Sequence, residues 1–567
     1  MTTLSISSDS FSRLPGLRIF EKIFSGQISD GGVLLEFEPG REQAGFTWTC
    51  SDGRCRVRYA RPCDAYRALG LLLAEESVSA ERSQNCTHES LGVMWDVSRN
   101  AVLHLEGWER LLQKFALLGI NSVQVYMEDV YVIPGEPLFG YGRGGYSAEE
   151  LRQIDDYAQN FGIEIIPCIQ TLGHLEQIFQ WPAYADDADV SGVLMVGEER
   201  TRNLIGKMLD QVAACFRSRT VHIGMDEAHG IGTGKYLRKH GYRRPFDILN
   251  EHLKMVVDMC KERGLHPMMW SDMYFRIGSA NNNYYDQESL IPDEVAAQVP
   301  ADVDLVYWDY YHTDTAFYEE WIQRHRKMGK EPILATGIWS WGRFWAYEAQ
   351  WKASLDAGMR AAGSKKLSHV FATAWGDDGA EFLPESVLPA IQYFAEWAYT
   401  GEPDQEALKR QFGVLSGAAC LDDYILASQI DRVPGIKKML YPVNYSRWIL
   451  WGDPVLGHMD AHITPDLPEH YRKLAEALDK SKTDEALCFV TQLARALSLK
   501  AELHLKARTA WREKDMDEIK RLQTEVLPKC LEAVRKLWQI HETAWMRWSK
   551  PFGWEIVEHR YAGCAAR

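Results

Sequence analysis

The stretch Val221-His222-Ile223-Gly224-Met225-Asp226-Glu227 is an apolar run that ends abruptly in two adjacent carboxylates. A short apolar run of this kind fits a strand that is buried on both faces of a parallel sheet. Two acids at such a strand end can divide the work of glycosidic bond cleavage if their environments separate their pKa values. The same pair also fits an ordinary turn in which one acid caps the next helix. The rest of the chain decides between these interpretations.

Seven further runs of similar length alternate with helical stretches, and Glu106–Leu118 and Ile248–Arg263 are typical of the latter. This alternation predicts βα units, and eight such units close into a (β/α)8 TIM barrel. The polar segment 279–283 interrupts the fifth unit and predicts a long loop there. The eight predicted strands are Leu91–Trp95, Ser122–Met127, Glu164–Ile169, Thr220–Gly224, Pro267–Trp270, Leu305–Trp308, Ile333–Gly337 and Val370–Ala374.

Two smaller regions flank the predicted barrel, which we assign to residues 86–399. Residues 1–85 read as a small α/β domain, with three strands and a helix at Gly32–Phe37, Gly45–Cys50, Arg54–Tyr59 and Asp64–Glu76. Residues 400–567 carry helical patterns and predict a helical C-terminal domain, with its longest helices at His470–Lys480, Asp484–Trp511 and Met516–His541.

Composition excludes several classes of partner. The net charge of −16 and the lack of a long basic run argue against nucleic acid. No apolar run is long enough to predict a membrane span, and the first residues do not resemble a signal peptide. The 11 cysteines have no metal-ligand spacing and predict reduced thiols in a cytoplasmic protein. The sequence leaves open whether the chain forms a homodimer.

The carboxyl ends of the eight strands carry aromatic and acidic residues, which is where barrel enzymes place their active sites. Aromatic walls with carboxylates suit a neutral sugar, whereas a phosphate would need glycine-rich amide nests or cations. The strand ends are, in order, Trp95-Asp96 with Arg99, Tyr126 to Asp129, Gly173-His174, Asp226-Glu227, Trp270-Ser271-Asp272, Trp308 to Tyr311, Trp339-Ser340-Trp341 and Trp375 to Asp378.

The order of these motifs resembles glycoside hydrolase family 20, the β-N-acetylhexosaminidases, in its branch with a small α/β domain, a barrel and a helical C-terminal domain. The resemblance rests on Asp96-Val97-Ser98-Arg99, 121–129, Gly173-His174, His222 to Glu227 and Trp375-Gly376-Asp377. It implies an exo-acting, retaining hydrolase for substrates with a terminal β-linked N-acetylhexosamine, small molecules or glycoconjugates. The acetamido group of such a substrate is the nucleophile, and no cofactor or metal is implied.

The resemblance also assigns roles to individual residues. Glu227 would be the general acid and then the base, and Asp226 would orient the acetamido group and stabilise the oxazolinium charge. His174 and Asp129 would form a relay that holds Glu227. The resemblance further implies Arg99 and Asp377 as contacts for the sugar hydroxyls, and Trp270, Trp339 and Trp375 as the walls of the pocket. It also implies a tyrosine after the sixth strand, for which the sequence offers Tyr307, Tyr310 and Tyr311. We prefer Tyr310, because period-two alternation puts it on the same side as Trp308.

Three other interpretations of the sequence remain open. A non-catalytic sugar-binding barrel would not need the Asp226-Glu227 pair. A double-displacement β-glycosidase would need a second carboxylate, for which Asp309 and Asp377 are the candidates. A metal-dependent barrel hydrolase would need His-x-His after the first strand, where this chain has Trp95-Asp96-Val97. His229 is expected to begin the helix that follows the fourth strand.

Overall fold

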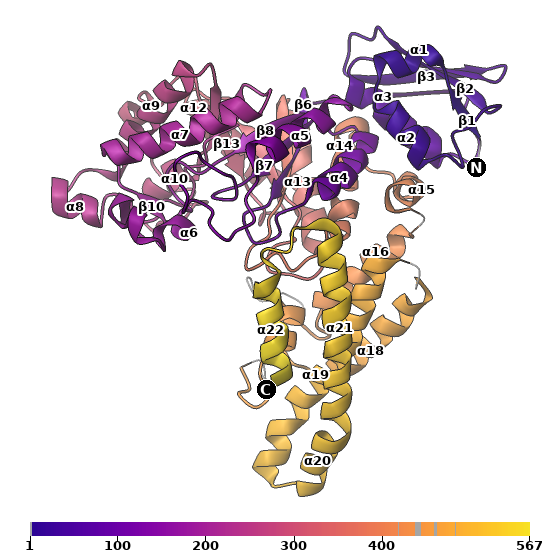
Figure 1. Ribbon diagram of the computed structural model, residues 1–567, viewed down its shortest axis with the longest axis vertical. Helices are drawn as coiled ribbons and strands as arrows, with labels where there is room; N and C mark the ends of the chain where they lie inside the picture. The colour runs from indigo at the N-terminus through magenta and orange to yellow at the C-terminus, as the bar shows by residue number, and fades with distance from the viewer. Residues whose placement is uncertain (1–2, 418, 437–443, 459–461, 482–483, 567) are drawn as a thin grey trace.

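The computed structural model describes residues 3–417, 419–436, 444–458, 462–481 and 484–566. Its three regions are separate in space, as Figure 1 shows: a small α/β unit at the N-terminus, a barrel with its surrounding helices, and a bundle of long helices that projects away from both. The chain passes through them in sequence order.

Eight parallel strands form a closed barrel in the order β11-β12-β13-β14-β15-β6-β7-β8. The predicted (β/α)8 fold is therefore confirmed. The strands are almost wholly buried, which is why each appears in the sequence as a continuous apolar run. Their bounds are β6 Ser90–Asp96, β7 Ser122–Tyr126, β8 Glu164–Cys168, β11 Thr220–His222, β12 His266–Trp270, β13 Asp304–Trp308, β14 Ile333–Gly337 and β15 His369–Ala374.

Amphipathic helices surround the barrel, and each buries one apolar face against the strands. The fifth unit departs from this pattern, because only two short helices, α10 (Asp272–Ile277) and α11 (Asp293–Ala296), lie between β12 and β13. The long loop predicted there connects them. The larger helices are α4 Leu105–Leu118, α5 Ala148–Gln159, α7 Glu199–Cys215, α9 Pro245–Glu262, α12 Thr315–Lys327, α13 Glu348–Lys365 and α14 Leu388–Thr400, and shorter elements after β8 and β11 are α6 Glu176–Phe179, β9 Ala188–Val190, β10 Val193–Leu194 and α8 Lys235–His240.

The N-terminal unit is a five-stranded sheet in the order β1-β2-β4-β3-β5. Its three central strands were predicted, but both edge strands were missed. A disulfide joins Cys50 to Cys55 across the β3–β4 hairpin, so the expectation that all cysteines are reduced is wrong for this pair. The elements are β1 Leu4–Ile6, α1 Ser8–Arg13, α2 Leu17–Ile23, β2 Val33–Pro39, β3 Gly45–Ser51, β4 Arg54–Tyr59, α3 Pro62–Ala74 and β5 Glu81–Asn85.

A buried ion pair ties this unit to the barrel. Arg67 of α3 reaches Glu396 of α14 at 2.6 Å, and neither side chain is more than 3% exposed. Arg67 also donates to Gln84 Oε1 and to the backbone oxygen of Leu118, so its buried charge is hydrogen-bonded on several sides. Helix α3 packs along α4 of the barrel.

The C-terminal region is helical, as predicted. Its longest helices, α19 (Glu485–Glu513) and α21 (Leu527–Trp548), run side by side in the projecting bundle (Figure 1). A five-residue π-helical segment, Leu522–Val526, precedes α21. The other helices are α15 Gln405–Ser416, α16 Leu421–Ala427, α17 Tyr445–Trp451, α18 Leu467–Leu478, α20 Met516–Arg521 and α22 Trp554–Ala566.

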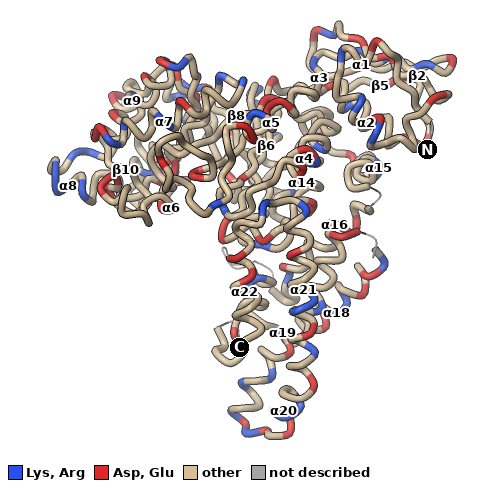
Figure 2. Tube along the Cα trace, viewed as in Figure 1, with Lys and Arg blue, Asp and Glu red and all other residues tan. Residues whose placement is uncertain are grey.

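Acidic and basic residues are interspersed along all three regions in Figure 2, without a continuous basic stripe in that view. This distribution agrees with the overall negative charge of the sequence. Within the described ranges, no helix combines the length and the apolar character that crossing a membrane requires.

Candidate active site

The motif that ends the fourth barrel strand has an unusual backbone. Strand β11 ends at His222, and the next residues include three with a left-handed conformation: Gly224 (φ +69°), Met225 (φ +70°) and Glu227 (φ +47°). Gly224 also has no room for a side chain, because a Cβ atom there would collide with Gln170 Oε1. Non-glycine residues in this region cost roughly 1–3 kcal/mol each and gather at functional sites. The turn brings both acids to the mouth of the barrel.

Asp226 lies in an enclosed, fully hydrogen-bonded position. Its Oδ1 accepts a hydrogen bond from Gln170 Nε2 at 2.7 Å, and its Oδ2 lies 3.2 Å from His174 Nε2. Burial alone would raise the pKa of Asp226, but the charge and hydrogen bond of His174, together with Gln170, hold this pKa below its usual value. Asp226 is therefore an ionised carboxylate at neutral pH.

Glu227 occupies a more open position than its neighbour. Its side chain is 37% exposed, against 10% for that of Asp226. Oε2 of Glu227 lies 3.5 Å from His174 Nε2, and Oε1 accepts a hydrogen bond from the Tyr284 hydroxyl at 3.2 Å. One adjacent pair of acids therefore has two different environments, as a division between charge stabilisation and proton transfer requires.

His174 links the two acids. Burial would lower the pKa of His174, but the charge and hydrogen bond of Asp226 and the charge of Glu128 raise it to about 10. The ring is therefore an imidazolium at neutral pH and places a positive charge between Asp226 and Glu227. Its own backbone is left-handed, with φ +54°, which turns the side chain into the barrel mouth.

The predicted relay partner of His174 lies elsewhere. Asp129 is buried and its Oδ1 accepts a hydrogen bond from Arg143 Nε at 3.4 Å, so the expected contact between Asp129 and His174 is wrong. The preceding residue, Glu128, faces the site instead and accepts from Arg99 Nη1 at 2.5 Å and from the Tyr126 hydroxyl at 3.0 Å. Glu128 has φ +46°, so the chain turns there and Glu128, not Asp129, contacts Arg99 and Tyr126 at the site.

Asp272 and Tyr284 contact Glu227 and were not predicted as site residues. The Glu227 N–H donates to Asp272 Oδ2 at 3.1 Å. Burial, and next the charge of Asp226, raise the pKa of Asp272 to about 8, so this carboxyl is largely protonated at pH 7. Tyr284 comes from the long loop of the fifth unit, and its hydroxyl also hydrogen-bonds His229. His229 thus supports Tyr284 and does not begin a helix, because α8 starts only at Lys235.

Aromatic rings enclose a cavity of about 100 Å³ around the two acids. Trp308 and Tyr310 stack with their ring centroids 5.1 Å apart, and Tyr311 lies beside them. Tyr307 points elsewhere and donates to the buried Asp309. The residues that line the cavity are Arg99, Tyr126, His174, Asp226, Glu227, Trp270, Trp308, Tyr310, Tyr311, Trp341, Trp375 and Asp377.

Trp339 is the predicted wall residue that lies outside this lining. Its Nε1 donates to the backbone oxygen of Tyr310 at 2.5 Å, and its ring packs 4.8 Å from that of Trp341. Trp341 forms the wall and Trp339 supports it from behind. The backbone of Trp339 has φ +56°, so the chain turns at this residue as well. Of the eleven predicted site residues, the structure brings all but Asp129 and Trp339 to the cavity.

A parallel barrel with two acids at one strand end, set between aromatic walls, defines a site of the glycoside hydrolase type. The chain belongs to glycoside hydrolase family 20: the model of the catalytic domain of that family matches residues 92–401, which is more than half of the chain. A second model, the C-terminal domain of glycoside hydrolase 20C, matches residues 422–567.

Individual relatives are more distant. Hexosaminidase D from Homo sapiens is 28% identical over 233 residues, which cover 39% of this chain and 45% of the human protein. Hexosaminidase D from Bos taurus is 28% identical over 225 residues, which cover 38% of this chain and 62% of the bovine protein. The matches thus span less than two thirds of either relative. The structure of the exo-β-N-acetylglucosaminidase from Vibrio harveyi with N-acetylglucosamine is similar in fold, with a TM-score of 0.55, 16% identity and 74% coverage of each chain.

Proposed function

We propose that this chain is an exo-acting β-N-acetylhexosaminidase that releases terminal β-linked N-acetylglucosamine or N-acetylgalactosamine with retention of configuration. The observation that carries the proposal is the unequal setting of Asp226 and Glu227, one enclosed and ionised, the other at the open side of the cavity. The names of the human and bovine relatives, and the N-acetylglucosamine complex of the Vibrio harveyi enzyme, agree with it.

In the proposed first step, the acetamido oxygen of the substrate attacks C1 while Glu227 gives its proton to the departing oxygen. The bond between C1 and the leaving group breaks, and a cyclic oxazolinium ion forms. In this proposal the positive charge of the ion develops beside the fixed negative charge of Asp226, and preorganised charge of this kind stabilises a transition state without reorganisation. In the second step Glu227 takes a proton from water, which attacks C1 and opens the ring. Two inversions at C1 leave the β configuration unchanged.

The walls and the polar residues divide the remaining work. In the proposed complex Trp270, Trp375 and Tyr310, which all line the cavity, enclose the acetamido end, and Tyr310 donates to the acetamido oxygen. Arg99 and Asp377 are the groups for the sugar hydroxyls, and both lie at the cavity. Asp377 has a pKa raised by burial and then lowered in part by Arg99, so the net shift is upward.

The double-displacement alternative is less well supported by the surroundings of its two candidate nucleophiles. Asp309 is fully buried, and its carboxylate accepts hydrogen bonds from the Tyr307 hydroxyl and from the Tyr311 N–H. His312 Nδ1 lies 2.8 Å from it. Asp377 lies near Arg99, where a hydroxyl-binding role fits better than attack on C1.

The test compares an aryl β-N-acetylglucosaminide with the matching aryl β-glucoside, which lacks the internal nucleophile. Since a well-placed internal nucleophile accelerates a reaction greatly, we expect the glucoside to have a kcat/KM lower by orders of magnitude. Proton NMR in the first minutes should detect the β anomer of the released sugar. Comparable kcat/KM values, or an initial α anomer, would overturn the mechanism.

A further inference from the structure

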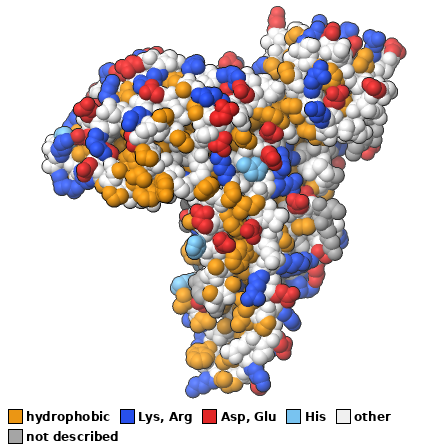
Figure 3. Space-filling model, viewed as in Figure 1, with side chains coloured by type: hydrophobic (Ala, Val, Ile, Leu, Met, Phe, Trp, Pro, Cys, Tyr) orange, Lys and Arg blue, Asp and Glu red, His pale blue; other side chains and the backbone are white. Residues whose placement is uncertain are grey.

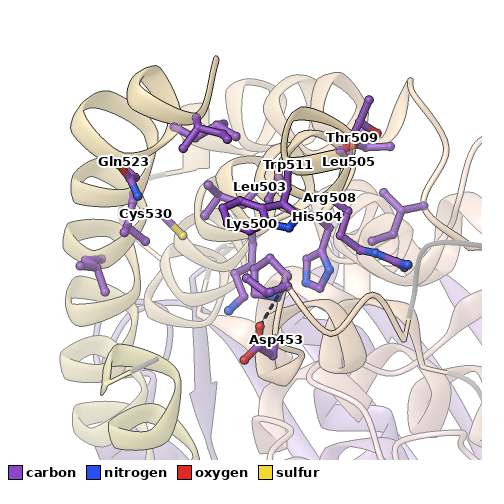
Figure 4. Close-up of a pocket in the computed structure, with 18 of the residues that line it drawn as sticks. Asp453, Lys500, Leu503, His504, Leu505, Arg508, Thr509, Trp511, Gln523 and Cys530 are labelled. Carbon is purple, nitrogen blue, oxygen red and sulfur yellow. Dashed lines mark hydrogen bonds between the residues drawn. The ribbon is translucent and has the colours of Figure 1, made fainter. Parts of the chain in front are cut away.

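A cavity of about 860 Å³, far larger than the one around the acids, lies within the C-terminal helices. Figure 4 shows Gln523 and Cys530 on one wall and residues of α19, among them Lys500, Leu503 and Trp511, across from them. Its volume falls within the range of about 300–1,000 Å³ that is usual for small-molecule sites. It belongs to a different region of the fold from the barrel mouth, so sugar cleavage does not account for it.

The walls of this cavity are mainly apolar. Helix α19 contributes Leu503, the π-helical segment contributes Leu522, and α21 contributes Leu527, Leu531 and Val534. The exposed rim is apolar too, with Trp511 76% and Val455 73% exposed. Hydrophobic side chains along the C-terminal helices are visible on the surface in Figure 3. Such walls fit an aliphatic chain.

One charged group lies inside this apolar space. Lys500 is only 6% exposed and lines the cavity, and its Nζ donates to Cys564 Sγ at 3.4 Å. A thiol is a weak acceptor, and an ammonium group has three hydrogens to donate. Within the described part of the chain, Lys500 forms no ion pair with a carboxylate. Burying such a cation is costly unless an anion accompanies it.

The charged residues of the lining and the backbone geometry beside it also indicate a ligand site. The cationic residues Lys500 and Arg512 of α19 line the cavity, together with the carboxylate of Asp453. The Asp453 carboxylate accepts the Val455 N–H. The π-helical segment Leu522–Val526 lies beside the same space, and π-helical turns recur at functional sites.

We propose that this cavity binds a single-chain amphiphile with a carboxylate head, the head paired with Lys500 and the alkyl chain held between α19 and α21. The ligand is thus of the class of medium-chain fatty acids. This site is separate from the proposed hexosaminidase site, so its test does not depend on hydrolytic activity.

The test uses the full-length protein and decanoate, below its micellar range, in isothermal titration calorimetry. We expect decanoate to bind, and to bind more tightly than decanol or decyltrimethylammonium. Lys500→Met keeps the length of the side chain and removes the charge, and should weaken decanoate binding about 10- to 100-fold while decanol binding stays the same. The control is Lys506→Met on the same helix, an exposed lysine paired with Glu502, which should bind decanoate as the wild type does.

A second variant, Leu531→Trp, fills the cavity from α21 and should abolish binding of both decanoate and decanol. Melting curves check that each variant is folded. The proposal fails if the wild type does not bind decanoate, if Lys500→Met binds it as tightly as the wild type, or if Leu531→Trp binds it unchanged.

Discussion

Replacing His174 by alanine tests the electrostatics of the site. Among the residues that line the cavity, His174 is the cation whose ring nitrogen lies close to both Asp226 and Glu227. The substitution leaves the enclosed Asp226 carboxylate with Gln170 as its remaining hydrogen-bond partner. Removing one member of a buried ion pair typically costs about 3–5 kcal/mol, since the other charge stays buried without compensation.

The pKa of His174 gives an independent magnitude. Asp226, opposing the effect of burial, raises it from 6.5 to about 10, and at about 1.4 kcal/mol for each pH unit this corresponds to roughly 5 kcal/mol. Because the pKa of the folded state lies above that of the unfolded state, this stabilisation is complete below pH 6.5 and disappears as the pH rises through 10. We therefore expect His174→Ala to lose several kcal/mol at pH 6 and much less at pH 9.5.

The assay is urea unfolding followed by circular dichroism at several pH values between 6 and 9.5. His266→Ala is the matched control: His266 also pairs with an aspartate, Asp304, at 2.8 Å, but both side chains are nearly half exposed. A solvent-screened pair of this kind should contribute little. The variant Asp226→Asn should remove most of the effect of His174→Ala. A stability loss for His174→Ala that does not change with pH, or one no larger than that of His266→Ala, would refute this account.

Three further predictions concern the neighbours of the general acid. Glu227→Gln should lower kcat by about 10²- to 10⁴-fold on substrates with poor leaving groups and much less on activated aryl glycosides; equal, small losses on both in steady-state assays would contradict the role of Glu227. Tyr284→Phe removes the hydroxyl that donates to Glu227 and should lower kcat by up to about tenfold with KM little changed. Asp272→Asn keeps an oxygen acceptor for the Glu227 N–H but cannot ionise. Since burial raises the pKa of Asp272 from 3.8 to about 8 in the folded state, melting curves should show the wild type losing stability relative to this variant as the pH rises from about 4 to 8, with no further relative loss above pH 8.

Much of the barrel was predictable because buried parallel strands leave a direct trace in the sequence. Each strand is apolar on both faces, so it reads as a short continuous run. The edge strand β5, Glu81–Asn85, has no such trace: it is polar, and its pairing with β3 is made by backbone groups. Tyr284 was missed for a related reason, since nothing in a polar loop between two short helices indicates a contact with a residue 57 positions earlier.

The two errors within the site lie at turns of the backbone. Period-two alternation was used for Tyr310, which lies beside Trp308 at the cavity, whereas Asp129 and Trp339 were assigned from the family resemblance. Glu128 and Trp339 both have positive φ and turn the chain, so that Glu128 contacts Arg99 and Tyr126 where Asp129 was expected, and Trp341 takes the wall position. Those left-handed residues are not readable from a sequence that places glutamate and tryptophan there, since both side chains disfavour that conformation.

The same left-handed residues explain how the site keeps its shape. His174, Met225 and Glu227 each adopt an unfavourable backbone conformation, which costs roughly 1–3 kcal/mol of stability per residue. Their surroundings hold them in place: Met225 is fully buried, and the Glu227 N–H is bonded to Asp272. A relaxed strand end would alternate its side chains and send adjacent acids to opposite sides. The strained turn keeps both acids at one cavity, so the cost in stability is the physical condition for their proposed joint action on a single sugar.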